Sequence, residues 1–182
     1  MTLLSSLRVH TGRVVALDID TVQFPNGNVG TLEMFRHPGA SAILPFLDDP
    51  RSADPRILLI RQFRHATGDF LWEIPAGRRD SGESPEATAH RELREETGHR
   101  CGQLEKLTQI WTTPGFTDEV IHLFLATDLT PGDSALEADE VLDVHHFRWS
   151  EVMQMARDGT IVDCKTLVAL LFAQSFCRPP RL

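Results

Sequence analysis

The segment Gly77–Gly98 reads GRRDSGESPEATAHRELREETG, and it decides the class of fold. Ser84 is a preferred N-cap residue, and Pro85 suits the first helical position because its missing N–H needs no partner there. Gly98 is a typical C-terminal stop, since glycine adopts the left-handed conformation that ends many helices. The segment therefore predicts a loop followed by a helix that ends near Gly98.

In this segment Glu83 precedes the predicted helix, and Glu92, Glu95 and Glu96 lie on it. Side chains three or four positions apart are neighbours on a helix, so the ionised carboxylates repel one another unless a positive charge lies among them. A solvated acidic face with pairs such as Arg91 to Glu95 is one interpretation. The other is a cation site, because clustered oxygen ligands suit Mg²⁺ or Mn²⁺, which also bind substrate phosphates.

The fixed residues of the segment resemble the Nudix box, G-x5-E-x7-R-E-U-x-E-E-x-G-U, in which U is an apolar residue. The matching positions are Gly77, Glu83, Arg91, Glu92, Leu93, Glu95, Glu96 and Gly98. Only the last apolar position departs from the pattern, since His99 occupies it. So many residue types at fixed offsets are far more specific than a lone glycine motif, and the departure concerns packing after the helix rather than a ligand.

The resemblance implies an α/β (α+β) fold, the Nudix α/β/α sandwich around a mixed sheet, in which the box forms a loop, a helix and a loop that hold divalent cations. Metal binding is expected at Glu92 and Glu96, with the backbone carbonyl of Ala76 as a further ligand and Glu95 close by. Arg91 is expected to orient these carboxylates. The implied cofactor is Mg²⁺ or Mn²⁺.

Sequence outside the box resembles the ADP-ribose pyrophosphatase branch of the family. The stretches concerned are HPGASAILPF, RQFR, FLWEIPAG and TTPGFTDE, whose Pro114 stands sixteen residues after Gly98. This resemblance implies metal-assisted attack of water on the diphosphate bond of ADP-ribose or a related nucleoside diphosphate sugar, giving AMP and a sugar phosphate. Arg64 of RQFR matches the branch's substrate-binding arginine, and a guanidinium suits a phosphate through its planar fork of donors. Without the family context, a charge at the end of a surface strand would be the simpler interpretation.

The remaining carboxylates have more open roles. Glu83 either lies behind the metal ligands or binds a further ion, although a helix N-terminus favours such a charge without any metal. The attacking water needs a base, and box carboxylates that hold metal are poor bases. In the branch the base tends to lie on a loop after the box, where this chain has the acidic stretch Leu136–Glu140. Glu140 or Glu137 is the expected base, with Glu95 as a further catalytic candidate, although an acidic loop is usually only solvated.

The N-terminal quarter is expected to form a β-hairpin over Arg13–Arg36. Two strand-like runs, RVVALDIDTVQF and VGTLEMFR, flank an Asn-Gly pair, which is a strong hairpin signal. By resemblance, such an appendage is exchanged between the subunits of a homodimer, so that both subunits line each substrate site. We therefore divide the chain into residues 1–38, a hairpin region for dimerisation, and residues 39–182, the Nudix hydrolase domain.

The rest of the chain alternates between strand-like and helix-like patterns. A second hairpin is expected from Ala42–Leu47 and Ile57–Ile60, on either side of a turn-rich stretch. Further strands are expected over residues 70–75, 104–112, 120–127 and 141–149, and further helices over residues 150–157 and 164–176. Strands on both sides of a central helix indicate an α+β or layered α/β fold rather than a regular parallel array.

Composition narrows the class of partner and the compartment. The formal net charge of −8 argues against a nucleic-acid surface, which relies on clustered Lys and Arg. The cysteines, Cys101, Cys164 and Cys177, are odd in number and widely separated, so reduced thiols are expected rather than disulfides or a zinc site. The apolar stretches are too short to cross a bilayer, and the N-terminus lacks the pattern of a signal peptide. A cytoplasmic protein without membrane or nucleic-acid partners is expected.

Two other functions fit the same residues. One is hydrolysis of a different nucleoside diphosphate derivative, such as FAD or a GDP-sugar, or of a nucleoside triphosphate; Pro114 and the N-terminal hairpin favour the ADP-ribose interpretation. The other is a non-catalytic regulator that binds ADP-ribose. The intact Glu92, Glu95 and Glu96 argue against a regulator, because binding alone does not need the repulsive carboxylates.

Overall fold

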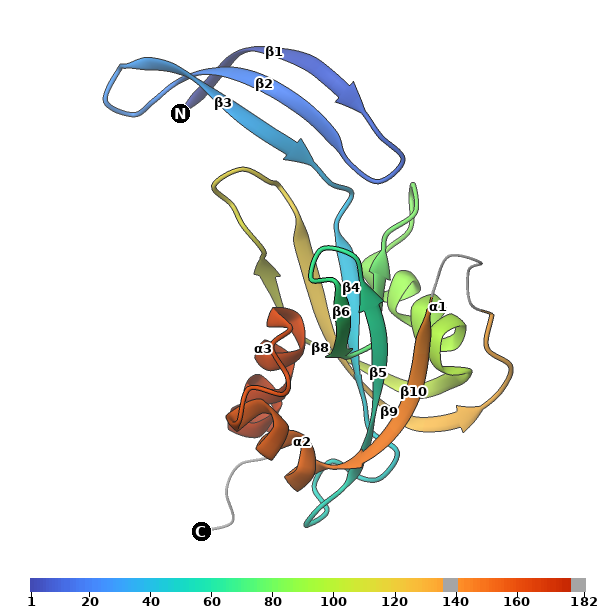
Figure 1. The fold of residues 1–182 in the computed structure, drawn as a ribbon. Coiled ribbons are helices and arrows are strands. Elements are labelled where there is room, and N and C mark those ends of the chain that lie inside the picture. Colours follow the sequence, from blue (N-terminus) through green and yellow to red (C-terminus); the bar gives the residue numbers. More distant parts are fainter. Residues whose placement is uncertain (136–140, 178–182) are drawn as a thin grey trace.

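The described part of the chain folds into a body of two sheets and three α-helices, with a separate sheet at the N-terminus (Figure 1). The computed structural model describes residues 1–135 and 141–177. Within the described part, α1 lies on one side of the body's strands, and α2 and α3 lie on the other (Figure 1). This layered arrangement confirms the predicted α/β class with a mixed sheet.

The N-terminal sheet has three antiparallel strands where the sequence predicted a two-stranded hairpin. Its strands are β1 (Thr2–Thr11), β2 (Ala16–Gln23) and β3 (Val29–Arg36), with β2 in the middle. The additional strand β1 pairs with β2, and Arg8 forms an ion pair with Asp18 across the pair. All of β1 is exposed, and its polar and apolar residues alternate only over residues 6–10, so the sequence gives only a short signal for this strand.

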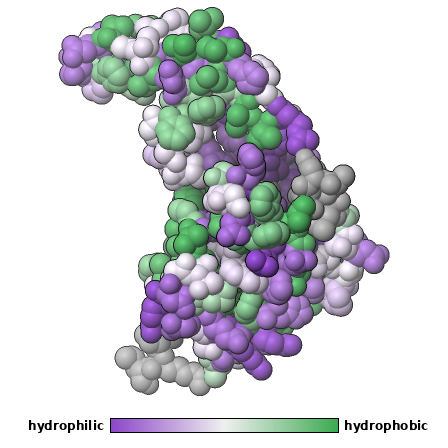
Figure 2. All heavy atoms as spheres, in the orientation of Figure 1, coloured by the Kyte–Doolittle hydropathy of each residue, from purple (hydrophilic) through white to green (hydrophobic). Residues whose placement is uncertain are grey.

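Apolar side chains remain uncovered on β1. Leu3, Leu4, Leu7 and Val9 are each more than half exposed. Figure 2 shows apolar residues among polar ones over this sheet, which projects from the body. An edge strand with exposed apolar side chains is suited to pairing with another chain.

The body contains a four-stranded and a three-stranded sheet. The four-stranded sheet has the order β7 (Ala76–Arg78), β4 (Ala40–Pro45), β9 (Val120–Pro131) and β8 (His99–Trp111). The three-stranded sheet has the order β10 (Leu142–Arg148), β5 (Arg56–Arg64) and β6 (Asp69–Glu73). Strand β4 runs parallel to β9, and the other pairs are antiparallel, so the larger sheet is mixed.

The predicted second hairpin is wrong, because its two strands belong to different sheets. Just after the end of β4, Phe46 forms an isolated bridge with Ile57 of β5, and the Leu47 N–H donates to the Arg56 carbonyl at 2.9 Å, but the two strands form no continuous ladder. Residues 42–44 of β4 and 57–60 of β5 are fully buried, as expected of strands covered on both faces. Each strand takes partners on both edges, β7 and β9 for β4 and β6 and β10 for β5, so neither edge is left for a hairpin.

Helix α1 (Pro85–Thr97) packs on one face of the larger sheet. Its buried Ala89 and Leu93 contact Ile43, Phe124 and Ala126 from β4 and β9. The ends of the helix are those that the sequence predicts: the Ser84 side chain accepts from the Ala87 N–H, and Gly98 has φ 68°. The box helix is therefore fixed on the sheet by its apolar face.

Helices α2 (Trp149–Arg157) and α3 (Cys164–Phe172) cover the opposite face, and a π-helical turn over Ala173–Cys177 follows α3. Trp149 was predicted as the end of a strand, but it is the first residue of α2. The reason is tertiary packing: Trp149 is buried, stacks on Phe46 and donates from its indole nitrogen to Gln174 at 2.7 Å.

Cys101, Cys164 and Cys177 are free thiols in the structure. Among the described residues, no helix combines the length and apolar character that crossing a bilayer requires.

Candidate active site

The box carboxylates lie where α1 meets the short strand β7. Glu92 and Glu96 are buried, at 6% and 2% exposure, although both are charged residues. Glu96 accepts a hydrogen bond from the Ala76 N–H at 2.9 Å. The structure thus brings three predicted metal-site residues, Ala76, Glu92 and Glu96, together at one helix–strand contact.

Gly77 allows this close contact. A Cβ atom at Gly77 would lie 1.9 Å from Glu92 Oε1, far inside van der Waals distance, so no other residue type fits while the carboxylate keeps its position. The first glycine of the box is therefore needed for the space that it leaves to Glu92.

We predict that Gly77→Ala lowers turnover about 100-fold with little change in thermal stability. The clash is with the end of the flexible Glu92 side chain, which can swing away, and a misplacement of about 1 Å near the chemistry can reduce the rate about 100-fold. Steady-state kinetics and thermal unfolding of the same preparation test this. Wild-type turnover with an unchanged melting temperature would contradict it.

Arg91 is the positive charge among these carboxylates. Its Nη1 donates to Glu92 Oε1 at 2.6 Å and to Glu95 Oε2 at 3.1 Å, while its Nη2 donates to the Arg78 carbonyl at 2.9 Å. The hydrogen bonds that Arg91 donates to Glu83, then the charge of Glu92 and the hydrogen bonds to Glu92 and Glu95, raise the pKa of Arg91 above its ordinary value. Arg91 therefore ties the helix carboxylates to β7, in keeping with the orienting role that the box implies.

Glu83 lies on the other side of Arg91 from the helix carboxylates. Both of its oxygens accept from Arg91, at 3.0 and 2.9 Å, and Thr88 Oγ1 donates to it at 2.8 Å. The hydrogen bonds from Arg91 lower the pKa of Glu83 to about 2. In this structure Glu83 is a partner of Arg91 behind the cluster.

The donor set fits a hard divalent cation with few protein ligands. In the described part of the chain, no three His, Cys, Asp or Glu side chains already have the arrangement of a metal centre. Mg²⁺ commonly uses only one or two carboxylates, with waters and substrate phosphates filling its other positions. Glu92, Glu96 and the backbone at Ala76 match that requirement, since all their donors are oxygens and the carboxylates are already buried side by side.

Arg64 lies at the end of β5 and is oriented by a buried acid. Its Nε and Nη2 donate to the two carboxylate oxygens of Glu73, each at 2.7 Å. The Arg64 side chain is 39% exposed, whereas that of Glu73 is 1% exposed. The guanidinium therefore reaches solvent, while the carboxylate that holds it is buried. A guanidinium fixed in this plane is suited to binding an anion.

One cavity joins Arg64 to the box carboxylates. Its volume is about 460 Å³, within the range of small-molecule sites. Its lining residues come from the β1–β2 turn, β5, β7, the β7–α1 connection and α1: Arg13, Val14, Gln62, Arg64, Ala76, Gly77, Arg78, Asp80, Arg91, Glu92, Glu95 and Glu96. Four arginines therefore face four carboxylates in this cavity, so it offers an anion both cationic side chains and a place for a metal ion.

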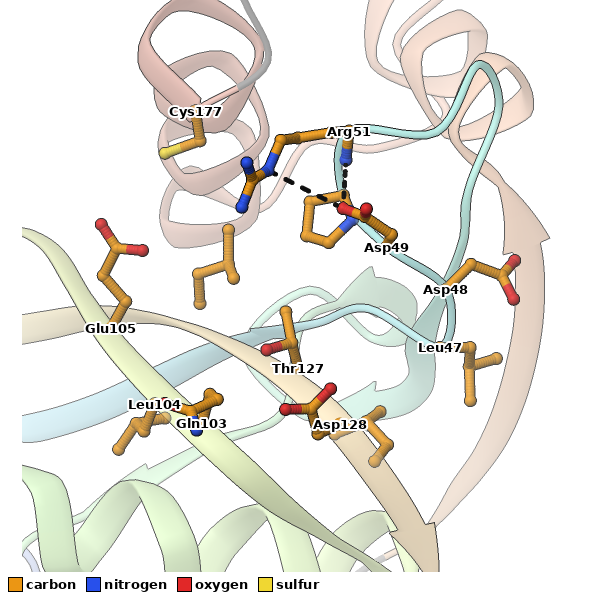
Figure 3. Close-up of a pocket in the computed structure, with 13 residues that line it drawn as sticks. Leu47, Asp48, Asp49, Arg51, Gln103, Leu104, Glu105, Thr127, Asp128 and Cys177 are labelled. Atoms are coloured by element: carbon orange, nitrogen blue, oxygen red, sulfur yellow. Dashed lines mark hydrogen bonds and ion pairs between the residues drawn. The ribbon is translucent and has the colours of Figure 1, made fainter.

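A larger cavity of about 640 Å³ lies elsewhere, between the β4–β5 connection, β8, β9 and Cys177 (Figure 3). Figure 3 shows Asp49 bonded to Arg51 there, with Glu105 and Asp128 on the opposite strands. Its lining has four acidic residues and one arginine, which disfavours a diphosphate. We therefore place the active site in the smaller cavity.

The structure adds residues that the sequence did not single out. Arg13 and Val14 of the N-terminal sheet line the cavity of their own chain, whereas the sequence led us to expect a contribution to a partner's site. The Arg13 carbonyl accepts from Arg78 Nη1 at 2.8 Å, which connects the sheet to β7. Gln62 is also in the lining, two positions before Arg64 on the same face of β5, and this spacing was the signal available in the sequence.

The expected general bases, Glu137 and Glu140, lie outside the described residues. Glu95 accepts from Arg91 and, at 2.9 Å, from Arg94 Nη2, and it lines the cavity. Glu95 is the catalytic candidate that lies within the described residues, and it lines the same cavity as the predicted metal ligands Glu92 and Glu96.

The comparison with protein families matches this geometry. The NUDIX domain model matches residues 36–167, which include β4, the whole box and both sheets of the body. The chain belongs to the Nudix family. The family resemblance read from Gly77–Gly98 is thereby confirmed.

The chain is also similar to individual proteins of known activity or structure. An ADP-ribose pyrophosphatase from Mycobacterium tuberculosis is 43% identical over 92% of this chain and 80% of its own length. A methanol dehydrogenase activator from Bacillus methanolicus is 38% identical over 92% of this chain and 89% of its own. A solved structure described as an ADP compounds hydrolase superposes with a TM-score of 0.81, at 23% identity, over 96% of this chain and 92% of that one, which supports the fold.

Proposed function

We propose that this Nudix protein hydrolyses the diphosphate bond of ADP-ribose or a related nucleoside diphosphate sugar, releasing AMP and a sugar phosphate. The observation that carries the proposal is a single cavity that contains the buried Glu92 and Glu96 together with the guanidinium of Arg64. A diphosphate needs cationic donors for its oxygens, and its hydrolysis needs oxygen ligands for a cation. The similarity to an ADP-ribose pyrophosphatase over 92% of the chain favours this substrate class.

In this proposal, some residues of the cavity bind the substrate or the metal ion, and others hold those residues in place. Arg64 donates to a substrate phosphate, since its planar fork matches phosphate oxygens. Arg91 keeps Glu92 and Glu95 in place. Glu92, Glu96 and the Ala76 carbonyl would hold Mg²⁺ or Mn²⁺, an ion that would supply charge neutralisation for phosphate oxygens and activation of water. Glu140 or Glu137 takes the proton of the attacking water, with Glu95 as the other candidate.

A substrate panel tests the proposal directly. ADP-ribose, FAD, a GDP-sugar and a nucleoside triphosphate are incubated separately with the protein and Mg²⁺, and the products are resolved by chromatography. We expect AMP and ribose 5-phosphate from ADP-ribose, and no product when a chelator removes the divalent cation. If the protein instead turns over FAD, the GDP-sugar or the triphosphate fastest, that compound represents the substrate class. The proposal of metal-assisted hydrolysis would then stand, but not the proposal of ADP-ribose as substrate.

A regulatory role is the second candidate, because one relative similar over most of its length is described as an activator of a dehydrogenase. The variant Glu92→Gln distinguishes the hydrolase from the regulator. A regulator that only binds its ligand keeps its effect on a partner when the carboxylate is removed, whereas a hydrolase loses activity.

We also propose a homodimer whose N-terminal sheets mediate contact between subunits. The exposed Leu3 and Leu7 of the edge strand β1 support this, because a monomer would leave them in water. The three free thiols suit the cytoplasm, where we propose that the protein resides with a small anionic substrate rather than nucleic acid.

The proposed dimer can be tested with a double charge variant and with a deletion variant. Leu3→Glu with Leu7→Glu should halve the mass measured by light scattering, because like charges at a shared edge repel, while the body stays folded. Deleting residues 1–36 should lower substrate affinity as well, because Arg13 and Val14 line the site. A dimeric charge variant, or a deletion variant with unchanged KM, would contradict these expectations.

A further inference from the structure

A network of buried charges lies behind Arg64. Glu73, at the end of β6, accepts from Arg64 through both oxygens, and the ammonium group of Lys165 contacts its Oε2 as well. The side chains of Glu73 and Lys165 are 1% and 9% exposed. Arg64 is therefore the member of this trio that reaches the cavity.

Lys165 is itself fixed by the start of α3. Its Nζ lies 3.0 Å from Asp163 Oδ1, and Asp163 caps the helix by accepting from the Thr166 N–H at 2.9 Å and from the Thr166 hydroxyl at 2.5 Å. The same hydroxyl accepts from the Ile74 N–H at 2.9 Å, directly after Glu73. Contacts with both α3 and the end of β6 thus fix the position of Lys165, and they keep its ammonium group buried behind Arg64.

Burying these charges needs an explanation beyond stability. Removing charges from water is unfavourable, and well-packed apolar residues often replace a buried ion pair without loss of stability. Burial by itself raises the pKa of Glu73, but the hydrogen bonds from Arg64 and the charge of Lys165 outweigh it and keep that pKa below its ordinary value. Glu73 therefore stays ionised and continues to hold Arg64.

The charge count shows what Lys165 contributes. Arg64 and Lys165 together balance Glu73 and Asp163, so the network is neutral as a whole. Without Lys165 it would carry one net negative charge beside the cavity, and Glu73 would offset the full charge of Arg64. Either effect weakens the attraction of an anion to this guanidinium.

We propose that Lys165 is a positioning residue for substrate binding: it shares Glu73 with Arg64, so that the guanidinium is fixed in its plane while its positive charge stays available to a phosphate. This inference rests on the proposed function, in which Arg64 binds the substrate diphosphate. Lys165 acts from the far side of Glu73.

The test uses the full-length protein and a non-hydrolysable analogue, α,β-methylene ADP-ribose, with saturating Mg²⁺. We expect Lys165→Met to weaken binding of the analogue about tenfold by calorimetry, equivalent to about 1.4 kcal/mol. KM for ADP-ribose should rise by a similar factor with kcat changed less than about twofold, because Arg64 binds ground state and transition state alike. Lys106→Met is the matched control, since Lys106 is the chain's other lysine and is exposed on β8; its affinity should equal that of the wild type.

A double-mutant cycle distinguishes positioning from general damage. If Lys165 acts through Arg64, Lys165→Met should have no further effect in an Arg64→Ala background, and Lys165→Arg should restore affinity by restoring the charge. A full tenfold effect in that background, or wild-type affinity of Lys165→Met alone, overturns the inference. Unchanged affinity of Arg64→Ala would instead overturn the phosphate-binding role of Arg64 in the proposed function.

A second variant keeps the test valid if Lys165→Met does not fold, since breaking a buried pair can destabilise a protein by about 3–5 kcal/mol. Glu73→Gln combined with Lys165→Met removes one charge of each sign and leaves an amide oxygen that can accept from Arg64. Because the acid that Lys165 balances is then neutral, the charge of Arg64 stays available without Lys165. We therefore expect the double variant to bind the analogue as tightly as Glu73→Gln alone, at a melting temperature closer to the wild type than that of Lys165→Met. Analogue binding about tenfold weaker in the double variant than in Glu73→Gln would also overturn the inference.

Discussion

Glu92→Gln and Glu96→Gln are each expected to lower turnover more than about 100-fold, because even the outer partners of metal ligands are worth about 10–100-fold. Each substitution removes one negative charge from a cluster that a cation must neutralise. The amide keeps the shape of the side chain, so Glu96→Gln can still accept from the Ala76 N–H. The fold should survive, and its melting temperature should not fall, because repulsion among the carboxylates decreases.

Kinetics across a Mg²⁺ titration and calorimetry of metal binding measure this effect. Glu86→Gln provides a matched control, because Glu86 lies in the first turn of the same helix but is exposed. Only the two buried positions should require more Mg²⁺ for half-maximal activity. Full activity of either variant at ordinary Mg²⁺, with unchanged metal affinity, would remove that residue from the ligand set.

Much of the site could be predicted because its signals are local in sequence. The helix start at Ser84, its end at Gly98 and the spacing of Glu92 and Glu96 all lie within one segment, and the structure has the helix between those limits. Periodicity on a single helix places side chains relative to one another before any tertiary contact is known. That is why the helix carboxylates could be grouped from the sequence.

The parts that could not be predicted depend on contacts between distant segments. Strand β1 alternates between polar and apolar residues only over residues 6–10, which is a short signal, and its pairing with β2 defines the rest of the strand. The separation of β4 from β5 follows from their other partners, which lie elsewhere in the chain. Glu73 and Lys165 are 92 positions apart, and neither residue by itself indicates that the other will neutralise it.

The general base gives the second large prediction. Glu140→Gln or Glu137→Gln is expected to lower kcat about 10²–10⁴-fold, which is the usual contribution of a positioned base. Metal affinity should change little, because a base acts on the water rather than on the ion. Glu105→Gln is a suitable control, since Glu105 is exposed on β8 and lines the other cavity.

The pH profile gives this prediction its sharpest form. A carboxylate base is active only when deprotonated, so the wild-type rate should rise with pH as the base loses its proton, and the variant that lacks the base should show a flat acidic limb. If that limb persists unchanged, it reports another group and the substituted glutamate is not the base. If kcat and metal affinity fall together, the residue is a ligand instead. If both variants keep wild-type kcat, the base lies among the remaining carboxylates, Glu95 at the cavity first and then Glu119, which accepts from the Thr112 hydroxyl at 2.9 Å.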